Sequence, residues 1–197
     1  MLNTPIHRIK LKDLDTDFIK RLQAEHGIDD TEVVLHIHPT SSHKRLTEED
    51  FWRIIDRLDW KQAGKDEAVV EPVVEYLASL EAAMIYQFED TLSQKLYQLD
   101  KRIFAEQDNE NGYRPANHFS VDIFLYARCC VIANGRKVFE QVLHNPTNFP
   151  KDLTFEALLY VAHDAYKRKT GRDMDYIPRY NYETFSNKEG WSNISSQ

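Results

Sequence analysis

The stretch from Phe119 to Leu143, FSVDIFLYARCCVIANGRKVFEQVL, constrains the fold of this chain more than any other. It holds the longest apolar run of the sequence and both cysteines. Ser120 is placed to cap a helix that begins there, and Asn134-Gly135 predicts its stop before a second helical segment. Apolar residues recur on one face of the first segment at Ile123, Ala127 and Cys130. So wide an apolar surface has to be buried, and we expect other helices to pack around it.

Helical spacing of apolar residues also predicts helices on both sides of this stretch. Thr47 with Asp50 resembles a capping box at the start of the first, and Pro72 predicts a first turn or a kink in the second. The predicted helices run over residues 47–58, 66–80, 81–105 and 152–170. The third is the most regular, with inward positions at Ile85, Phe88, Leu92, Leu96, Leu99 and Ile103.

The N-terminal residues follow a different pattern. Residues 6–11 and 31–38 are predicted to form short strands on either side of a helix that Gly27 ends. Two strands and one helix bury too little to be stable alone, so this unit is expected to pack on the body. The predicted fold class is therefore mainly α, a multi-helix orthogonal or antiparallel bundle with a small N-terminal β-α-β appendage (α+β).

The chain is expected to divide into four parts, within the range of one domain and a small appendage for 197 residues. The first part is the α/β unit over 1–38, and the second is a polar linker over 39–46. The third is the helical domain over 47–171, and the fourth is an irregular, aromatic-rich tail over 172–197.

Composition excludes several classes of function. A net charge of −7 argues against a nucleic-acid-binding protein, because phosphate contacts need clustered lysine and arginine. No apolar run approaches the roughly 20 residues of a membrane helix, and the first residues lack the apolar core of a secretory signal. The two cysteines are adjacent, which excludes a disulfide framework. These features favour a cytoplasmic protein.

Several motifs resemble a known family. They are FWRIID at 51–56, Ser120-x-Asp122-x-Phe124-x-x-x-Arg128, and Gly135-Arg136-x-x-Phe139-Glu140-x-x-Leu143 followed by Asn145-Pro146. Together they resemble a bacterial domain family of unknown function that is filed near molybdenum-metabolism-regulator-like and WGR-containing proteins. The similarity covers about residues 47–150. The resemblance implies a mainly helical fold and supplies no catalytic residues.

Asp122 and Arg128, two charges set among apolar neighbours, make the first candidate site. Six positions apart on a helix, they face different directions and do not pair with each other. A structural polar network is the first interpretation, in which Arg128 finds a carboxylate on another helix. The carboxylates that could serve it are those of Glu89, Asp90 and Asp100. The alternative is a ligand pocket, because an arginine fork binds carboxylates and phosphates well. The other candidates for such a pocket are Tyr126 and His118.

His36 and His38 make a speculative metal pair, because alternate positions of a strand place both imidazoles on one face. His43 or His7 could add a third ligand. No HExxH, CxxC or carboxylate-flanked pattern accompanies them, so an ordinary strand face is favoured and no metal or other cofactor is predicted.

The two cysteines are interpreted as small core residues. A catalytic cysteine needs a base, and His118 or His163 would have to arrive through the fold. The basic run over 166–172 is interpreted as a solvated helix end, because aspartates on both sides offset its charge.

The aromatic residues of the tail allow two interpretations. They are Tyr176, Tyr180, Tyr182 and Trp191. So many aromatic rings are seldom left in water, so we expect the tail to wrap back over the body. Alternatively, they form a surface that recognises a partner, because aromatic side chains dominate binding hot spots.

The leading hypothesis is a non-catalytic interaction or regulatory module whose partner is another protein, since many structural signals and no assembled catalytic set are present. One alternative is an enzyme or small-molecule-binding protein with a polar cleft around Asp122 and Arg128. Another is an immunity-type protein that binds a basic toxin, which the acidic charge allows.

Overall fold

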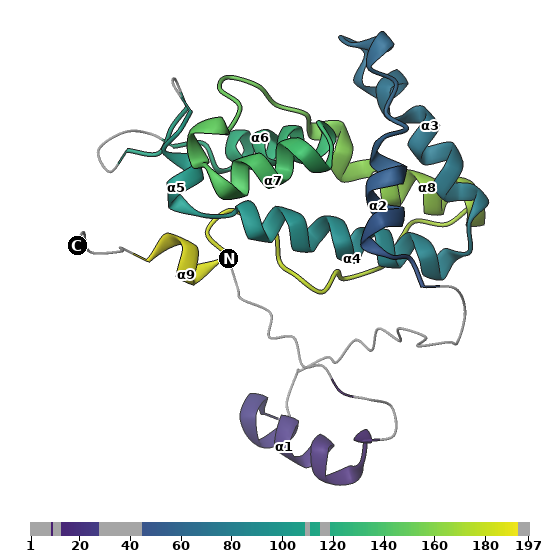
Figure 1. Cartoon of the computed structure of the whole chain (residues 1–197). Coiled ribbons are helices and arrows are strands. Elements are labelled where there is room, and N and C mark those ends of the chain that lie inside the picture. The colour runs from purple at the N-terminus through teal and green to yellow at the C-terminus, as the bar shows by residue number, and fades with distance from the viewer. Residues whose placement is uncertain (1–8, 10–12, 28–44, 109–110, 115–118, 193–197) are drawn as a thin grey trace. The chain divides into compact units, whose positions relative to one another are not determined.

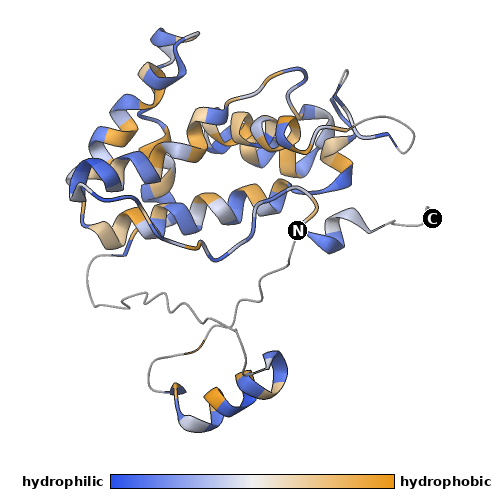
Figure 2. Cartoon of the chain, turned by 180° about the vertical axis from the view of Figure 1, so that it is seen from behind, coloured by the Kyte–Doolittle hydropathy of each residue, from blue (hydrophilic) through white to orange (hydrophobic). Residues whose placement is uncertain are grey.

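The computed structural model describes residues 9, 13–27, 45–108, 111–114 and 119–192. The chain divides into two compact units, residues 1–38 and residues 39–197. Of the first unit the structure describes one helix, α1 (Thr16–His26), which Asp15 caps and Gly27 ends. No residue of α1 is buried, and hydrophilic residues dominate it (Figure 2).

The second unit is a helical bundle (Figure 1). Its helices are α2 (Glu48–Ile55), η2 (Trp60–Gln62), α3 (Asp66–Ser79), α4 (Ala82–Leu99), α5 (Arg102–Ala105), α6 (Val121–Ala133), α7 (Arg136–His144), η3 (Pro146–Asn148), η4 (Glu156–Tyr160), α8 (Val161–Thr170) and α9 (Lys188–Trp191). Here α is an α-helix and η a 3₁₀ helix. α4 packs against α6, α8 and α3, and α3 packs along α8.

The prediction of an α+β fold with a β-α-β appendage is wrong. Among the described residues there is no β-strand, and Ile9, inside the first predicted strand, lies outside any regular element. The other residues of that segment, and all of 31–38, lie outside the described residues. The one described helix of this unit, α1, buries none of its residues, so the described part of the unit has no packed core, and two strands with one helix bury too little to be stable alone.

The central stretch forms the core of the bundle, as predicted. Ser120 accepts a hydrogen bond from the Ile123 amide and caps α6, which buries nine of its residues. Gly135 precedes α7 with a φ of +88°, a conformation that suits glycine. Thr47 and Asp50 form the predicted capping box of α2.

Two helix predictions need correction. Of the two alternatives for Pro72, the first turn is wrong, because Pro72 lies inside α3, which begins six residues earlier, and the kink stays a prediction. The helix predicted over 81–105 ends at Leu99 and is followed by the short α5. Ile103, predicted to face inward, is 49% exposed because the break turns it away from the core.

The core assignment predicts contrasting effects for two aliphatic residues of the same predicted helix. Leu92 is 1% exposed and Ile103 is 49% exposed. Leu92→Ala should lower the free energy of unfolding by about 3–5 kcal/mol, because a cavity adds to the lost transfer energy. Ile103→Ala should cost less than about 1 kcal/mol. Urea denaturation of both variants checks this, and equal losses would contradict the assignment.

Candidate functional site

Arg128 lies in α6 and is completely buried. Its Nη1 donates to the carbonyl oxygens of Leu96 and Tyr182, both at 3.0 Å, and its Nη2 donates to Thr184 Oγ1 at 2.9 Å. Its Nε has no hydrogen-bond partner in the described part of the chain. Two of its three hydrogen bonds therefore go to residues more than fifty positions away, after α8.

Asp100, directly after α4, is a second completely buried charge. Its Oδ1 accepts from the Phe185 amide at 3.2 Å and from Trp191 Nε1 at 2.8 Å. Its Oδ2 accepts from the Asn187 amide at 2.9 Å and from the Ser186 hydroxyl at 3.2 Å. All four donors follow α8 in the sequence.

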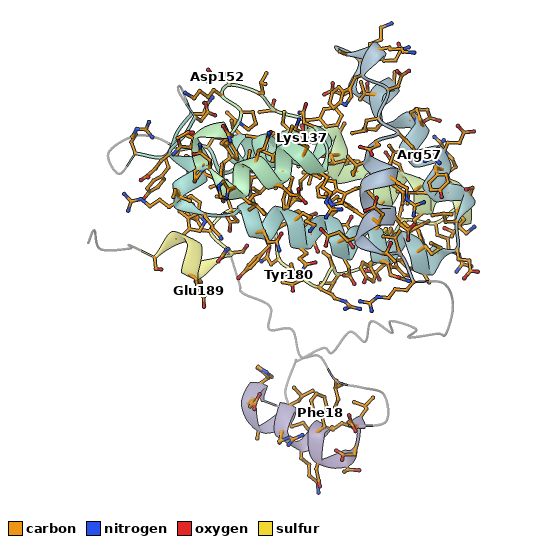
Figure 3. The ribbon with its side chains drawn as sticks, viewed as in Figure 1. Phe18, Arg57, Lys137, Asp152, Tyr180 and Glu189 are labelled. Atoms are coloured by element: carbon orange, nitrogen blue, oxygen red, sulfur yellow. The ribbon has the colours of Figure 1, made fainter. Side chains whose placement is uncertain are left out.

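These donors and acceptors belong to an irregular segment, residues 172–191, which we call the strap. The strap runs along α4 in the direction of the helix (Figure 1), and Tyr180 lies beside α4 with Glu189 further on, in α9 (Figure 3). Its contacts with α4 are a Tyr176–Tyr86 ring stack at 4.4 Å, an Arg179 Nε–Asp90 Oδ2 ion pair at 2.7 Å and a hydrogen bond from Asn187 Nδ2 to the Tyr97 carbonyl at 3.1 Å. The strap is thus anchored at both ends of α4.

The four aromatic residues proposed as a partner surface all lie in the strap and are half-buried against the body. Tyr176 stacks on Tyr86, and Tyr180 contacts Tyr97 with ring centres 5.5 Å apart. Tyr182 supplies a carbonyl to Arg128, and Trp191 packs its ring edge against Phe124. These rings contact the protein itself.

Glu89 of α4 is a buried carboxyl group next to the strap, with 7% of its surface exposed. Its Oε2 has no hydrogen-bond partner among the described residues. Burial, with a smaller effect of the neighbouring Asp90 charge, raises the pKa of Glu89 to about 7. Burial also raises the pKa of Tyr182, with a smaller contribution from the charge of Glu89. The sequence indicated Glu89 only as a possible partner for Arg128.

The structure does not bring the predicted pocket residues together. Asp122 is exposed in the first turn of α6, whereas Arg128 is fully buried. Tyr126 is half-buried, and burial together with a hydrogen bond to Glu156 raises its pKa. His118 lies outside the described residues. Asp122 and Arg128 therefore do not face a common cavity.

The cysteine and histidine candidates are also dispersed. Cys129 is fully buried and Cys130 is 6% exposed, and burial raises the pKa of both thiols, which keeps them protonated. His163 lies half-buried on α8, 3.5 Å from an Asp164 oxygen. His36 and His38 lie outside the described residues. Within the residues that are described, no three metal-ligating side chains cluster.

An open groove of about 710 Å³ lies between α3 and the η4–α8 segment. Its apolar residues are Val70, Val74 and Ala157. Its polar residues are Asp66, Glu67, Glu71, Glu156, Tyr160, Asp164, Lys167 and Arg168. The side chain of Tyr160 is half exposed, and its hydroxyl donates to Glu156 Oε1 at 2.8 Å. The groove thus combines an apolar part and an exposed aromatic ring with charged walls.

The charge of this groove is acidic, because both cations are already paired. Arg168 binds Glu71 through two hydrogen bonds of 2.6 and 2.9 Å. Lys167 binds Asp173, with Nζ and Oδ1 2.9 Å apart. The described structure places no lysine or arginine in an ion pair with the other lining carboxylates, those of Asp66, Glu67, Glu156 and Asp164. The basic run of the sequence analysis therefore contributes little free positive charge here.

A buried cation elsewhere holds the body together. Lys95 of α4 is 6% exposed, and its Nζ lies 2.6 Å from Glu48 Oε1, on α2. This hydrogen bond lowers the pKa of Glu48. The rings of Trp52 and Phe139 lie within 6 Å of Nζ, at 5.8 and 5.2 Å. The arrangement links α2, α4 and α7, with the Lys95 side chain 7% exposed and the Glu48 side chain 55% exposed.

The fold and these sites define a helical domain with two buried charges bonded to a strap and one open acidic groove. The chain belongs to the family described as a protein of unknown function (DUF4240), whose model matches residues 46–168. This match confirms the resemblance to a family of unknown function. It does not support the resemblance to molybdenum-metabolism regulators or to WGR-containing proteins. No curated protein and no solved structure matches the chain. The strap lies outside the matched residues.

No helix of the described residues is long and apolar enough to cross a membrane.

Proposed function

We propose that this protein is a non-catalytic interaction module that binds a basic segment of another protein in the groove between α3 and η4–α8. The observation that supports the proposal is the open groove of about 710 Å³ whose unpaired charges are all negative. A lysine- or arginine-rich segment complements such walls, and complementary charge speeds association and selects the partner.

The uncharged part of the groove favours a protein partner over a free cation. Ala157 of η4 is half-buried and offers apolar surface on which the aliphatic stem of lysine or arginine can lie. Val70 and Val74 of α3 line the groove but are only 6% and 2% exposed. Tyr160 adds a half-exposed ring over which a guanidinium can stack. A basic toxin bound by an immunity-type protein would have the same chemistry.

As part of the same proposal the protein acts in the cytoplasm. Its two thiols are both free, which suits a reducing compartment.

A titration with a synthetic lysine-rich peptide of helical propensity tests this proposal. Glu67→Gln combined with Asp164→Asn removes one exposed carboxylate from each wall of the groove. We expect this double variant to weaken binding, measured by calorimetry at about 0.15 M salt, by about tenfold, which corresponds to about 1.4 kcal/mol.

A matched control separates the groove from general attraction to an acidic protein. Glu81→Gln combined with Glu189→Gln changes the net charge equally at two exposed positions outside the groove. This variant should bind the peptide within about twofold of the wild type, because distant exposed charges are screened by salt. Equal weakening of both variants would contradict a groove-specific site.

A further inference from the structure

The body recognises the strap through both its side chains and its main chain, and four of the hydrogen bonds are with main-chain groups of the strap. Asp90 Oδ1 accepts from the Arg179 amide at 2.8 Å, and Arg128 donates to the Tyr182 carbonyl at 3.0 Å. Asp100 accepts from two further strap amides, those of Phe185 and Asn187. Contacts of this kind specify an extended path along α4, and any chain segment with the same backbone conformation satisfies them.

The two buried charges make an empty strap site unfavourable. All four hydrogen bonds that Asp100 accepts in the described structure come from the strap. Arg128 would keep only its bond to the Leu96 carbonyl. Because a buried charge that loses its partners is strongly destabilising, the strap site favours replacement of one segment by another over simple release.

The segment that fits this site best is the strap of a second copy of the chain. The strap of a second copy has the same donors and acceptors in the same order. Every hydrogen bond that a single chain forms between its strap and its own body can therefore form again between two chains. The route of the strap out of the body begins at Gly171, whose φ of +71° ends α8 in the left-handed conformation. Open space surrounds the position of a Cβ there, and the next two residues are exposed. A change of backbone direction at this point meets no packed side chain.

We propose that two copies of this protein exchange their straps, so that residues 172–191 of each lie along α4 of the other. Exchange of an identical element is a low-cost route to a dimer, because the bonds are unchanged and only the connection differs. The wild-type dimer is therefore expected to form at high protein concentration and to dissociate on dilution. This inference uses the strap site alone and is independent of the acidic groove.

Charge reversal across one strap contact tests the exchange. Asp90 and Arg179 form an ion pair in which the Asp90 side chain is 11% exposed and the Arg179 side chain is 61% exposed. Asp90→Arg in one variant and Arg179→Glu in another each place like charges together, within a monomer and within a homodimer alike. Both substitutions leave the bonds of Asp100 and Arg128 intact, so both variants are expected to fold. Mixing them restores opposite charges at both contacts only if each strap crosses to the other copy.

Native mass spectrometry of the mixture reads out the result, because the two variants differ in mass. We expect a dimer with one copy of each variant in the mixture, and monomers when either variant is alone. The control pair is Glu71→Arg and Arg168→Glu, which reverses an ion pair between α3 and α8 that no strap exchange can restore. Monomers in the first mixture, or mixed dimers of the control pair to the same extent, would overturn the proposal.

Discussion

Replacing Asp100 by alanine is expected to lower the free energy of unfolding by about 3–5 kcal/mol, the cost typical of removing one partner from a buried charged pair. The substitution leaves four donors of the strap without an acceptor. It also removes the negative charge that raises the pKa of Arg128 against the lowering effect of burial. Urea denaturation followed by fluorescence measures the loss, since Trp191 donates directly to Asp100.

Asp122→Ala is the matched control for this experiment. Asp122 is the same residue type in the same bundle, but its side chain is exposed. Its removal should change the free energy of unfolding by no more than about 0.5 kcal/mol. A loss below about 1 kcal/mol for Asp100→Ala would show that the strap does not depend on this carboxylate.

Glu89→Gln is expected to remove most of a pH dependence of stability between pH 5 and pH 8. Burial raises the pKa of Glu89 to about 7 in the folded protein, from 4.5 for a glutamate side chain in water. Below pH 4.5 the carboxyl group is protonated in both states, and its burial carries no ionic penalty. As the pH rises from 4.5 to 7, only the unfolded chain ionises, so the free energy of unfolding falls. Above pH 7 the loss is complete, at about 3 kcal/mol for a shift of this size.

Thermal or urea unfolding at several pH values compares wild type with Glu89→Gln. The variant, which stays neutral, should match the wild type near pH 5 and exceed its stability by about 3 kcal/mol at pH 8. Glu75→Gln, at an exposed position of α3, is the control. It shows how the loss of a surface carboxylate changes the pH dependence of the free energy of unfolding. A pH profile of Glu89→Gln that parallels the wild type would contradict a buried, unpaired carboxyl group at this position.

Local patterns in the sequence predicted the helices well where the signals lie within a few residues. The caps at Ser120 and Thr47 and the stop before α7 follow from short-range spacing. The single core face expected at Ile123, Ala127 and Cys130 does not, because α6 is buried on nearly all sides and Ile123 is only half-buried. The break after Leu99 could not be predicted this way. The apolar spacing continues through Ile103, but Asp100 is held by strap groups more than eighty residues away.

The partners of Arg128 show the same limit. Sequence analysis supplied carboxylates as candidates, among them Asp100, whose charge does act on the guanidinium. Its hydrogen-bond acceptors are two carbonyls and the Thr184 hydroxyl, and the two carbonyls cannot be recognised from residue type. Main-chain partners can be identified only once the path of the strap is known.

The acidic groove had a partial signal in the sequence. Glu67 and Glu71 lie one helical turn apart, and Glu156, Tyr160 and Asp164 continue at steps of four. Each series predicts a polar face on its own element. That the two faces meet depends on the packing of α3 against α8, which joins residues about ninety positions apart.

The central claim is that the open binding surface of this protein is the acidic groove. Amide chemical-shift mapping by NMR, with the lysine-rich peptide added to the full chain, tests it most directly. We expect shifts in residues 66–74 of α3 and 156–168 of η4 and α8, with the amides of the strap unchanged. Shifts centred on residues 176–191, or spread evenly over the acidic surface, would contradict it.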